Sequence, residues 1–168
     1  MADITPAAGT REARLIAMMN EHEEALLRMC AVYLRDAALA EDAVQDTFVK
    51  AYRAMDAFRG GSSEKTWLMR IAINTCKDMR KGAWFRHVDH RVALDNLPAP
   101  LAAPSGAQSD LALTVMELPQ KHLEAVLLHY YQGMTVREVA QALGIPHQTV
   151  SSRLKRAREA LRATLEEV

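Results

Sequence analysis

The chain has 168 residues, of which 49% are hydrophobic and 25% are charged, and its formal net charge is zero. This length suits one medium domain or two small ones, and the composition is that of a globular protein. Zero net charge argues against a protein that coats nucleic acid indiscriminately, although local basic patches can still bind it. The N-terminus lacks signal-peptide architecture and no apolar run approaches a membrane span, so we expect a cytoplasmic protein without membrane insertion.

The N-terminal half predicts a bundle of helices. A weak helix from Arg11 to about Asn20 leads into a broad apolar face over residues 21–35, and a further amphipathic pattern runs from Ala40 to Met55. The two cysteines, Cys30 and Cys76, lie inside helical patterns. With nothing else to suggest a disulfide framework, we expect buried free thiols in a reducing compartment.

The outer face of residues 41–56 begins with carboxylates. Acidic side chains in the first turn favour the helix dipole, so on chemistry alone simple helix stabilisation is the preferred interpretation of this face. The loop FRGGSS at residues 58–63 then breaks the helix, and a serine can cap a helix from about Glu64 to Lys81. The aromatic ring of Phe58 in this loop could plug the bundle end or stack on an unpaired base.

The helix over residues 64–81 has two faces. Trp67 and other large side chains recur on the inward face, whereas an outward basic stripe recurs at i, i+4, i+7 and i+11 spacing: Arg70, Asn74, Lys77 and Lys81. Between Lys65 and Arg91 there are seven basic residues and two acidic ones. A site for an anionic partner is therefore plausible here.

Residues 83–110 are dominated by Pro, Ala, Gly and Ser and predict a flexible linker. Such a linker has a typical end-to-end distance of roughly 30 Å, so the two halves can sit far apart. A short helix over Leu111–Glu117 is expected next. Another helix, with Pro119 in its first turn, is expected to reach Gln132 and to brace the segment that follows.

The segment from Thr135 to Leu161 predicts two helices joined by a tight turn. Thr135 and Glu138 form a capping-box pattern, and Gly144 stands where a left-handed residue ends a helix. The second helix has a buried stripe: Val150, Leu154, Ala157 and Leu161. Its other side is polar and then basic, with five basic residues and one acidic residue between His147 and Arg162. This is the pattern of a helix-turn-helix that reads a DNA major groove.

No catalytic constellation emerges from the sequence. It contains no Gly-rich phosphate loop, no nucleophile elbow and no paired-cysteine motif, so we expect neither an enzyme nor a cofactor. His87 and His90 are the metal-ligand candidates considered, but two histidines beside a linker are far more often exposed to solvent. We therefore assign no metal.

Three segments, at residues 40–60, 66–81 and 118–161, together resemble the extracytoplasmic-function sigma factors of bacterial RNA polymerase. They read AEDAVQDTFVKAYRAMDAFRG, TWLMRIAINTCKDMRK and LPQKHLEAVLLHYYQGMTVREVAQALGIPHQTVSSRLKRAREAL, in the order found in that family. The resemblance implies an all-α fold of two small helical domains joined by a flexible linker. Region 2 would span residues 11–82, the linker 83–110 and region 4 residues 111–168.

The resemblance also implies a function, which is to direct core RNA polymerase to promoter DNA and to help melt the minus-10 element. It assigns roles to three surfaces. We call these the core-binding surface (Asp42, Gln45, Asp46, Val49 and Arg53), the minus-10 surface (Phe58, Trp67, Arg70, Asn74 and Lys77) and the minus-35 surface (Gln148, Ser151, Ser152, Arg153, Lys155 and Arg156). The core-binding role reverses the preference for simple helix stabilisation.

One departure from the family pattern is the pair His147-Gln148 before Thr149, where the family often has glycine before a Thr-Val pair. With no further domain expected after Val168, the resemblance implies control by an anti-sigma factor. The alternative is a helix-turn-helix regulator of another class, whose N-terminal bundle serves dimerisation or sensing.

Overall fold

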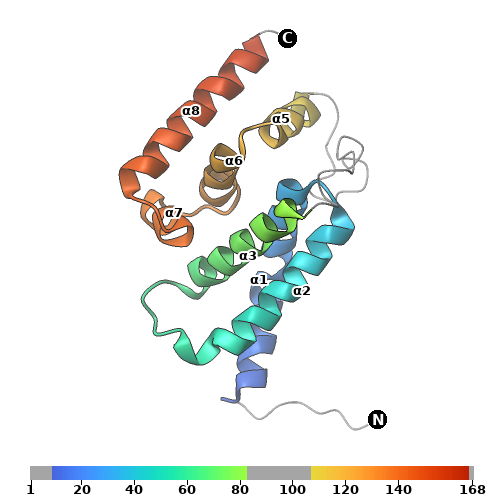
Figure 1. Cartoon of the computed structure of the whole chain (residues 1–168), viewed down its shortest axis with the longest axis vertical. Coiled ribbons are helices and arrows are strands. Elements are labelled where there is room, and N and C mark those ends of the chain that lie inside the picture. The colour runs from blue at the N-terminus through green and yellow to red at the C-terminus, as the bar shows by residue number, and fades with distance from the viewer. Residues whose placement is uncertain (1–8, 83–106, 167–168) are drawn as a thin grey trace.

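The structure is a computed structural model that describes residues 9–82 and 107–166, and Figure 1 shows two groups of helices. The N-terminal group contains α1 (Arg11–Leu34), α2 (Ala37–Ala54), the short 3₁₀ turn η1 (Met55–Ala57) and α3 (Glu64–Lys81). The C-terminal group contains α5 (Ala107–Met116), α6 (Gln120–Val126), the π-helical turn η3 (Leu127–Tyr131), α7 (Val136–Leu143) and α8 (His147–Glu166). Over these residues the structure has no strand, and the predicted all-α fold is confirmed.

Side-chain caps fix where the helices of the N-terminal group begin. The hydroxyl of Thr10, the carboxylate of Asp36 and the hydroxyl of Ser63 each accept a hydrogen bond from a backbone N–H three residues on. Arg35 ends α1 in the left-handed conformation with a φ of 55°. This sharp reversal lets α2 return along α1, and α3 packs against both.

The observed elements differ from expectation at four points, the first being α2, which begins at Ala37 rather than at Ala40. α1 is one continuous helix, where the sequence indicated a weak segment followed by a stronger one. α5 begins at Ala107, four residues before the expected start at Leu111. Pro119 is the residue that precedes α6, and the helix expected to reach Gln132 changes at Leu127 from α to π geometry.

The two groups of helices pack against each other (Figure 1). α3 lies along α7, and buried side chains of both groups form one continuous hydrophobic cluster. In this structure the two halves are in contact, and the linker's capacity to let them sit far apart stays a prediction. Residues 83–106, most of the predicted linker, lie outside the described residues, as do His87 and His90.

Cys30 on α1 and Cys76 on α3 are buried free thiols, as expected, with their sulfur atoms 3.5 Å apart. The hydrogen bond between them, together with burial, raises the pKa of Cys76 well above that of an exposed thiol. Within residues 9–82 and 107–166, no helix combines the length and apolar character needed to cross a bilayer.

Candidate nucleic-acid interface

The helix-turn-helix has the geometry that its sequence predicts. The hydroxyl of Thr135 accepts from the backbone N–H of Glu138 at 3.2 Å, and the Glu138 side chain returns to the Thr135 backbone, which completes the capping box. Gly144 ends α7 with a φ of 65°, a conformation that costs glycine nothing. α8 therefore leaves the turn in a direction fixed by backbone geometry.

The minus-35 surface lies on the outer side of α8. Val150, Leu154 and Ala157 are buried and Leu161 is partly buried, so the predicted stripe packs inward. The side chains on the opposite side point to solvent, except that Arg153 is half-buried. The exposed members are Gln148, Ser151, Ser152, Lys155 and Arg156. This side is polar near the helix N-terminus and cationic after it, as a groove-reading helix requires.

Sequence reasoning missed two contacts that α8 makes with other helices, one with His122 and one with Tyr130. The ring of His122 on α6 lies close enough to Arg153 and Arg156 that burial, followed by their positive charges, lowers its pKa. Arg158 donates to the hydroxyl of Tyr130 at 3.0 Å and so ties the middle of α8 to η3. Nothing in the spacing of the sequence indicates either contact, because both join separate helices.

The loop after α2 forms a cavity of about 380 Å³ against α3. The rings of Phe58 and Trp67 stack in its wall with centroids 4.7 Å apart and planes inclined by 25°. The guanidinium of Arg14 lies 5.7 Å from the centroid of Phe58, and Arg70 lines the opening. Phe58 is half-buried and stacked on Trp67 at the cavity wall, and both interpretations of its ring stay predictions.

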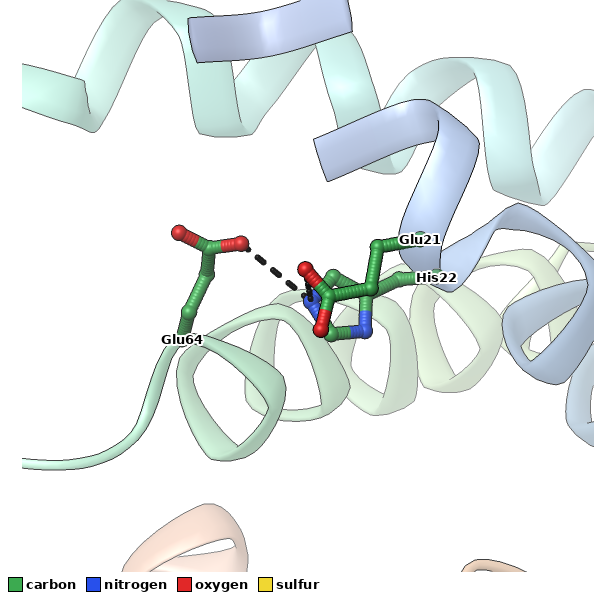
Figure 2. Close-up of side chains that lie close together, drawn as sticks. All are labelled: Glu21, His22 and Glu64. Carbon is green, nitrogen blue, oxygen red and sulfur yellow. Dashed lines mark hydrogen bonds and ion pairs between the residues drawn. The ribbon is translucent and has the colours of Figure 1, made fainter. Parts of the chain in front are cut away.

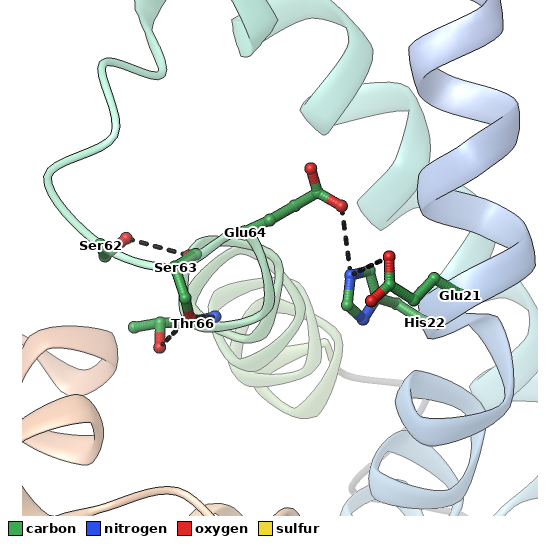
Figure 3. Close-up of polar contacts among 6 residues, drawn as sticks. All are labelled: Glu21, His22, Ser62, Ser63, Glu64 and Thr66. Carbon is green, nitrogen blue, oxygen red and sulfur yellow. Dashed lines mark hydrogen bonds and ion pairs between the residues drawn. The ribbon is translucent and has the colours of Figure 1, made fainter.

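The end of this loop is held by polar contacts (Figure 3). The hydroxyl of Ser63 accepts from the backbone N–H of Thr66 at 3.1 Å and donates to its hydroxyl at 2.9 Å. Nε2 of His22, on α1, lies 3.2 Å from a carboxylate oxygen of Glu64, the first residue of α3. The start of α3, and with it the cavity, is thus fastened to α1.

A second carboxylate joins this contact (Figure 2), since an oxygen of Glu21 lies 3.8 Å from the same nitrogen of His22. The three ligand atoms lie within 4.8 Å of one another, so a cation could reach all of them. The Glu21 side chain is 72% exposed and His22 already bonds to Glu64, so the arrangement is satisfied as a hydrogen-bonded contact between helices. Sequence reasoning missed it because residues 22 and 64 are far apart in the chain.

The outward stripe of α3 is only partly open to solvent. Arg70, Asn74 and Lys81 are exposed, as the spacing predicts. Lys77 is not, because its ammonium lies 3.4 Å from the buried carboxylate of Glu124 on α6 and its side chain is 29% exposed. The prediction that all four side chains face solvent is wrong at Lys77, since the C-terminal group covers that part of α3.

The core-binding surface is one exposed side of α2. Asp42, Gln45, Asp46, Val49 and Arg53 are all exposed, while their neighbours Ala43, Val44, Thr47 and Phe48 are buried. Beside it lies a mainly apolar groove of about 540 Å³ between α1 and α2, lined by Leu15, Met19, Phe48 and Val49 among others. Val49 is 47% exposed at the groove. The sequence predicted the polar side of α2 and missed the groove.

Comparison with known proteins shows which family the chain belongs to. Sigma-70 region 2 matches residues 18–86, and Sigma-70, region 4 matches residues 109–161. The ECF RNA polymerase sigma factor SigL of Mycobacterium tuberculosis is 32% identical over an alignment that covers 100% of this chain and 98% of SigL. The chain belongs to the extracytoplasmic-function sigma factors. Like them, this sigma factor acts in transcription initiation.

Two solved structures are similar to this sigma factor over nearly all its length. CnrH, in complex with the cytosolic domain of CnrY, is 29% identical with a TM-score of 0.73, covering 96% of this chain and 92% of CnrH. RpoE of Bartonella quintana, in complex with the anti-sigma factor NepR, is 30% identical with a TM-score of 0.67. The alignment covers 89% of this chain and 97% of RpoE. Both comparison structures are thus complexes with a further protein.

Proposed function

We propose that this sigma factor docks on core RNA polymerase through α2, traps the melted minus-10 strand with α3 and the preceding loop, and reads the minus-35 duplex with α8. The residues are those of the three surfaces defined above. The protein acts without catalysis of its own and without a cofactor, because its contribution is to position the polymerase and to bind DNA.

The observation that carries this proposal is the cavity at the start of α3. Stacked Phe58 and Trp67 form an aromatic wall, and Arg70 and the exposed Asn74 follow on the same helix. Turning a base out of the duplex costs a few kcal/mol, and stacking on an aromatic ring returns about 1 to 3 kcal/mol per base. A regulator that only grips duplex DNA has no use for such a cavity.

The side of α2 that carries the core-binding surface suits a protein partner. Carboxylates and an arginine surround Val49, and the apolar groove lies directly beside them. An apolar depression with a charged rim is typical of a protein-binding site, since the centre supplies affinity and the rim supplies specificity. Membership of the sigma factor family indicates core polymerase as the partner of this surface.

Control by an anti-sigma factor is part of the proposal. It is supported by the similarity to Bartonella RpoE, whose structure contains the anti-sigma factor NepR. The same proposal places this sigma factor in the cytoplasm, where polymerase and promoter DNA are found.

The proposal is tested by separating melting from duplex binding. Holoenzyme carrying Asn74→Ala should bind the minus-35 duplex normally but leave minus-10 thymines less reactive to permanganate. Asn20→Ala is the matched control, because Asn20 is also exposed and lies on α1. Equal permanganate reactivity for Asn74→Ala and wild type would remove the base-trapping role.

The alternative regulator is tested by a separate binding measurement on the isolated chain. Tight operator binding by the isolated chain, with no change in polymerase specificity when core enzyme is added, would replace the proposed function by the regulator. A pull-down with purified core polymerase gives an independent result, since the regulator does not need that contact.

A further inference from the structure

Glu124 on α6 is a buried carboxylate whose partners come mostly from the other half of the chain. It is 1% exposed. One oxygen accepts from the hydroxyl of Tyr33 at 2.8 Å, and the other lies 3.4 Å from the ammonium of Lys77. Gln120 on the same helix donates to it at 3.3 Å. A carboxylate is costly to bury unless it is paired, so α1 and α3 supply what α6 alone lacks.

Tyr33 is suited to this contact. Its side chain is fully buried, and burial together with the charge of Glu124 raises its pKa above the ordinary tyrosine value. The hydroxyl therefore keeps its proton and remains a donor. The guanidinium of Arg80 lies 5.1 Å from the centre of the same ring, which adds positive charge near the carboxylate.

Further contacts of the same kind join the two groups of helices. The ammonium of Lys65 donates to the backbone carbonyl of Gln132 at 2.6 Å, and the guanidinium of Arg35 donates to the carbonyl of Met116. In each case the N-terminal group provides the cation and the C-terminal group provides the oxygen acceptor. The phosphate oxygens of DNA are anionic acceptors, so the carboxylate of Glu124 offers Lys77 the kind of contact that a DNA phosphate would offer.

The packing covers the minus-10 surface unequally. Lys77 is paired with Glu124, and Gln141 of α7 contributes to the wall of the cavity that holds Phe58 and Trp67. Most of the minus-35 surface stays exposed in the same arrangement. DNA cannot take the place of Glu124 at Lys77 unless α6 moves away from α3.

We propose that Glu124 is a charge latch: its carboxylate pairs with Lys77 where a DNA phosphate would otherwise bind, and this pairing keeps the free protein closed to single-stranded minus-10 DNA. This inference rests on the proposed function, because it regulates the minus-10 surface defined there. The closed and open arrangements are two populations, and a strand that binds only the open one has its apparent affinity reduced by the open fraction. Loss of the Glu124 charge increases that fraction.

The test compares three variants of the free, full-length chain. Glu124→Gln removes the charge and keeps the size, and Tyr33→Phe removes one donor and keeps the ring. Glu166→Gln makes the same change of charge at an exposed position near the end of α8 and serves as the control. Each is examined by acetylation of lysine amines followed by mass spectrometry, and by small-angle X-ray scattering.

Binding is measured by fluorescence anisotropy with a single-stranded minus-10 oligonucleotide from a promoter found by transcript start mapping. For Glu124→Gln we expect faster acetylation of Lys77, a larger radius of gyration and about tenfold tighter binding of the strand. Tyr33→Phe should shift all three in the same direction by less, with the acetylation rate and the strand affinity changing about threefold or less. Glu166→Gln should match wild type.

Unchanged or slower acetylation of Lys77, or unchanged affinity for the strand, in both Glu124→Gln and Tyr33→Phe would overturn the latch. Circular dichroism checks that each variant is folded. If Glu124→Gln is unfolded, the result for Tyr33→Phe alone tests the latch. Failure of the proposed function is recognised separately: wild-type protein with core polymerase would then give no promoter-specific transcript, whatever the reactivity of Lys77.

Discussion

Arg156 offers a direct test of how α8 meets DNA. From Gln148 to Arg156 the exposed side advances eight residues, which is about 12 Å along a helix. That length matches the width of the major groove and three to four base pairs. Arg156 is exposed while Leu154 and Ala157 beside it are buried, so truncation to alanine should remove the proposed contact with DNA and leave the apolar packing of α8 unchanged.

The expected magnitude depends on what Arg156 touches. If the guanidinium pairs with a guanine edge, Arg156→Ala costs about 1 to 3 kcal/mol of binding free energy, or roughly 5- to 150-fold in affinity, and discrimination at one base pair is relaxed. If it touches only a phosphate, affinity falls for all sequences alike, and the slope of log affinity against log salt decreases by about one.

The assay is binding of holoenzyme to labelled minus-35 duplexes, wild type and singly substituted, at several salt concentrations. Arg162→Ala, six residues further along α8 and also exposed, is the control and should lose less affinity. Affinity within twofold of wild type on every duplex and at every salt concentration would refute the assignment of Arg156 to the minus-35 surface. Core binding, measured by pull-down, should not change.

Three other substitutions test separate parts of the structure. Val49→Asp places a charge at the apolar groove, where Val49 is 47% exposed, so it should weaken a pull-down with core polymerase without lowering the melting temperature; undiminished binding would exclude the α2 side as the docking site. Thr135→Ala removes the cap of α7 and should cost about 1 kcal/mol of unfolding free energy by urea denaturation, whereas a loss below a few tenths would mean that the cap is dispensable. His122→Asn tests pH dependence. Folding lowers the His122 pKa from 6.5, chiefly through burial. The wild-type protein therefore keeps its stability above pH 6.5 and loses stability as the pH falls from 6.5 toward the folded-state pKa. The variant should lose less stability between pH 7.5 and 5.5 in thermal melts, and identical losses would contradict this cause.

Local signals in the sequence predicted most helix boundaries. The serine before Glu64, the capping box at Thr135 and Gly144 each act within one turn of helix, so neighbouring residues are enough to identify them. The buried stripe of α8 was equally readable, because apolar side chains at helical spacing must face one side. The π-helical turn after Val126 was not predicted, because no local pattern in the sequence indicates it.

The contacts between the two halves could not be predicted from local patterns. Glu124 gave one signal, a carboxylate among apolar residues on a helix expected to pack inward, and such a residue needs a partner. The identity of that partner was hidden, because Tyr33 lies 91 residues away in the chain. For the same reason Lys77 was predicted to face solvent: its spacing on α3 says nothing about a helix that folds over it.

Arg35 illustrates why relieving local backbone strain can destabilise the assembled fold. Its left-handed conformation suits glycine better, and relieving it would be worth on the order of 1 kcal/mol. Glycine, however, has no guanidinium to reach the carbonyl of Met116. A stability-engineering survey that scored only the backbone conformation at residue 35 would recommend Arg35→Gly. The resulting protein would have less backbone strain after α1, but it would lose the hydrogen bond that joins its two halves there.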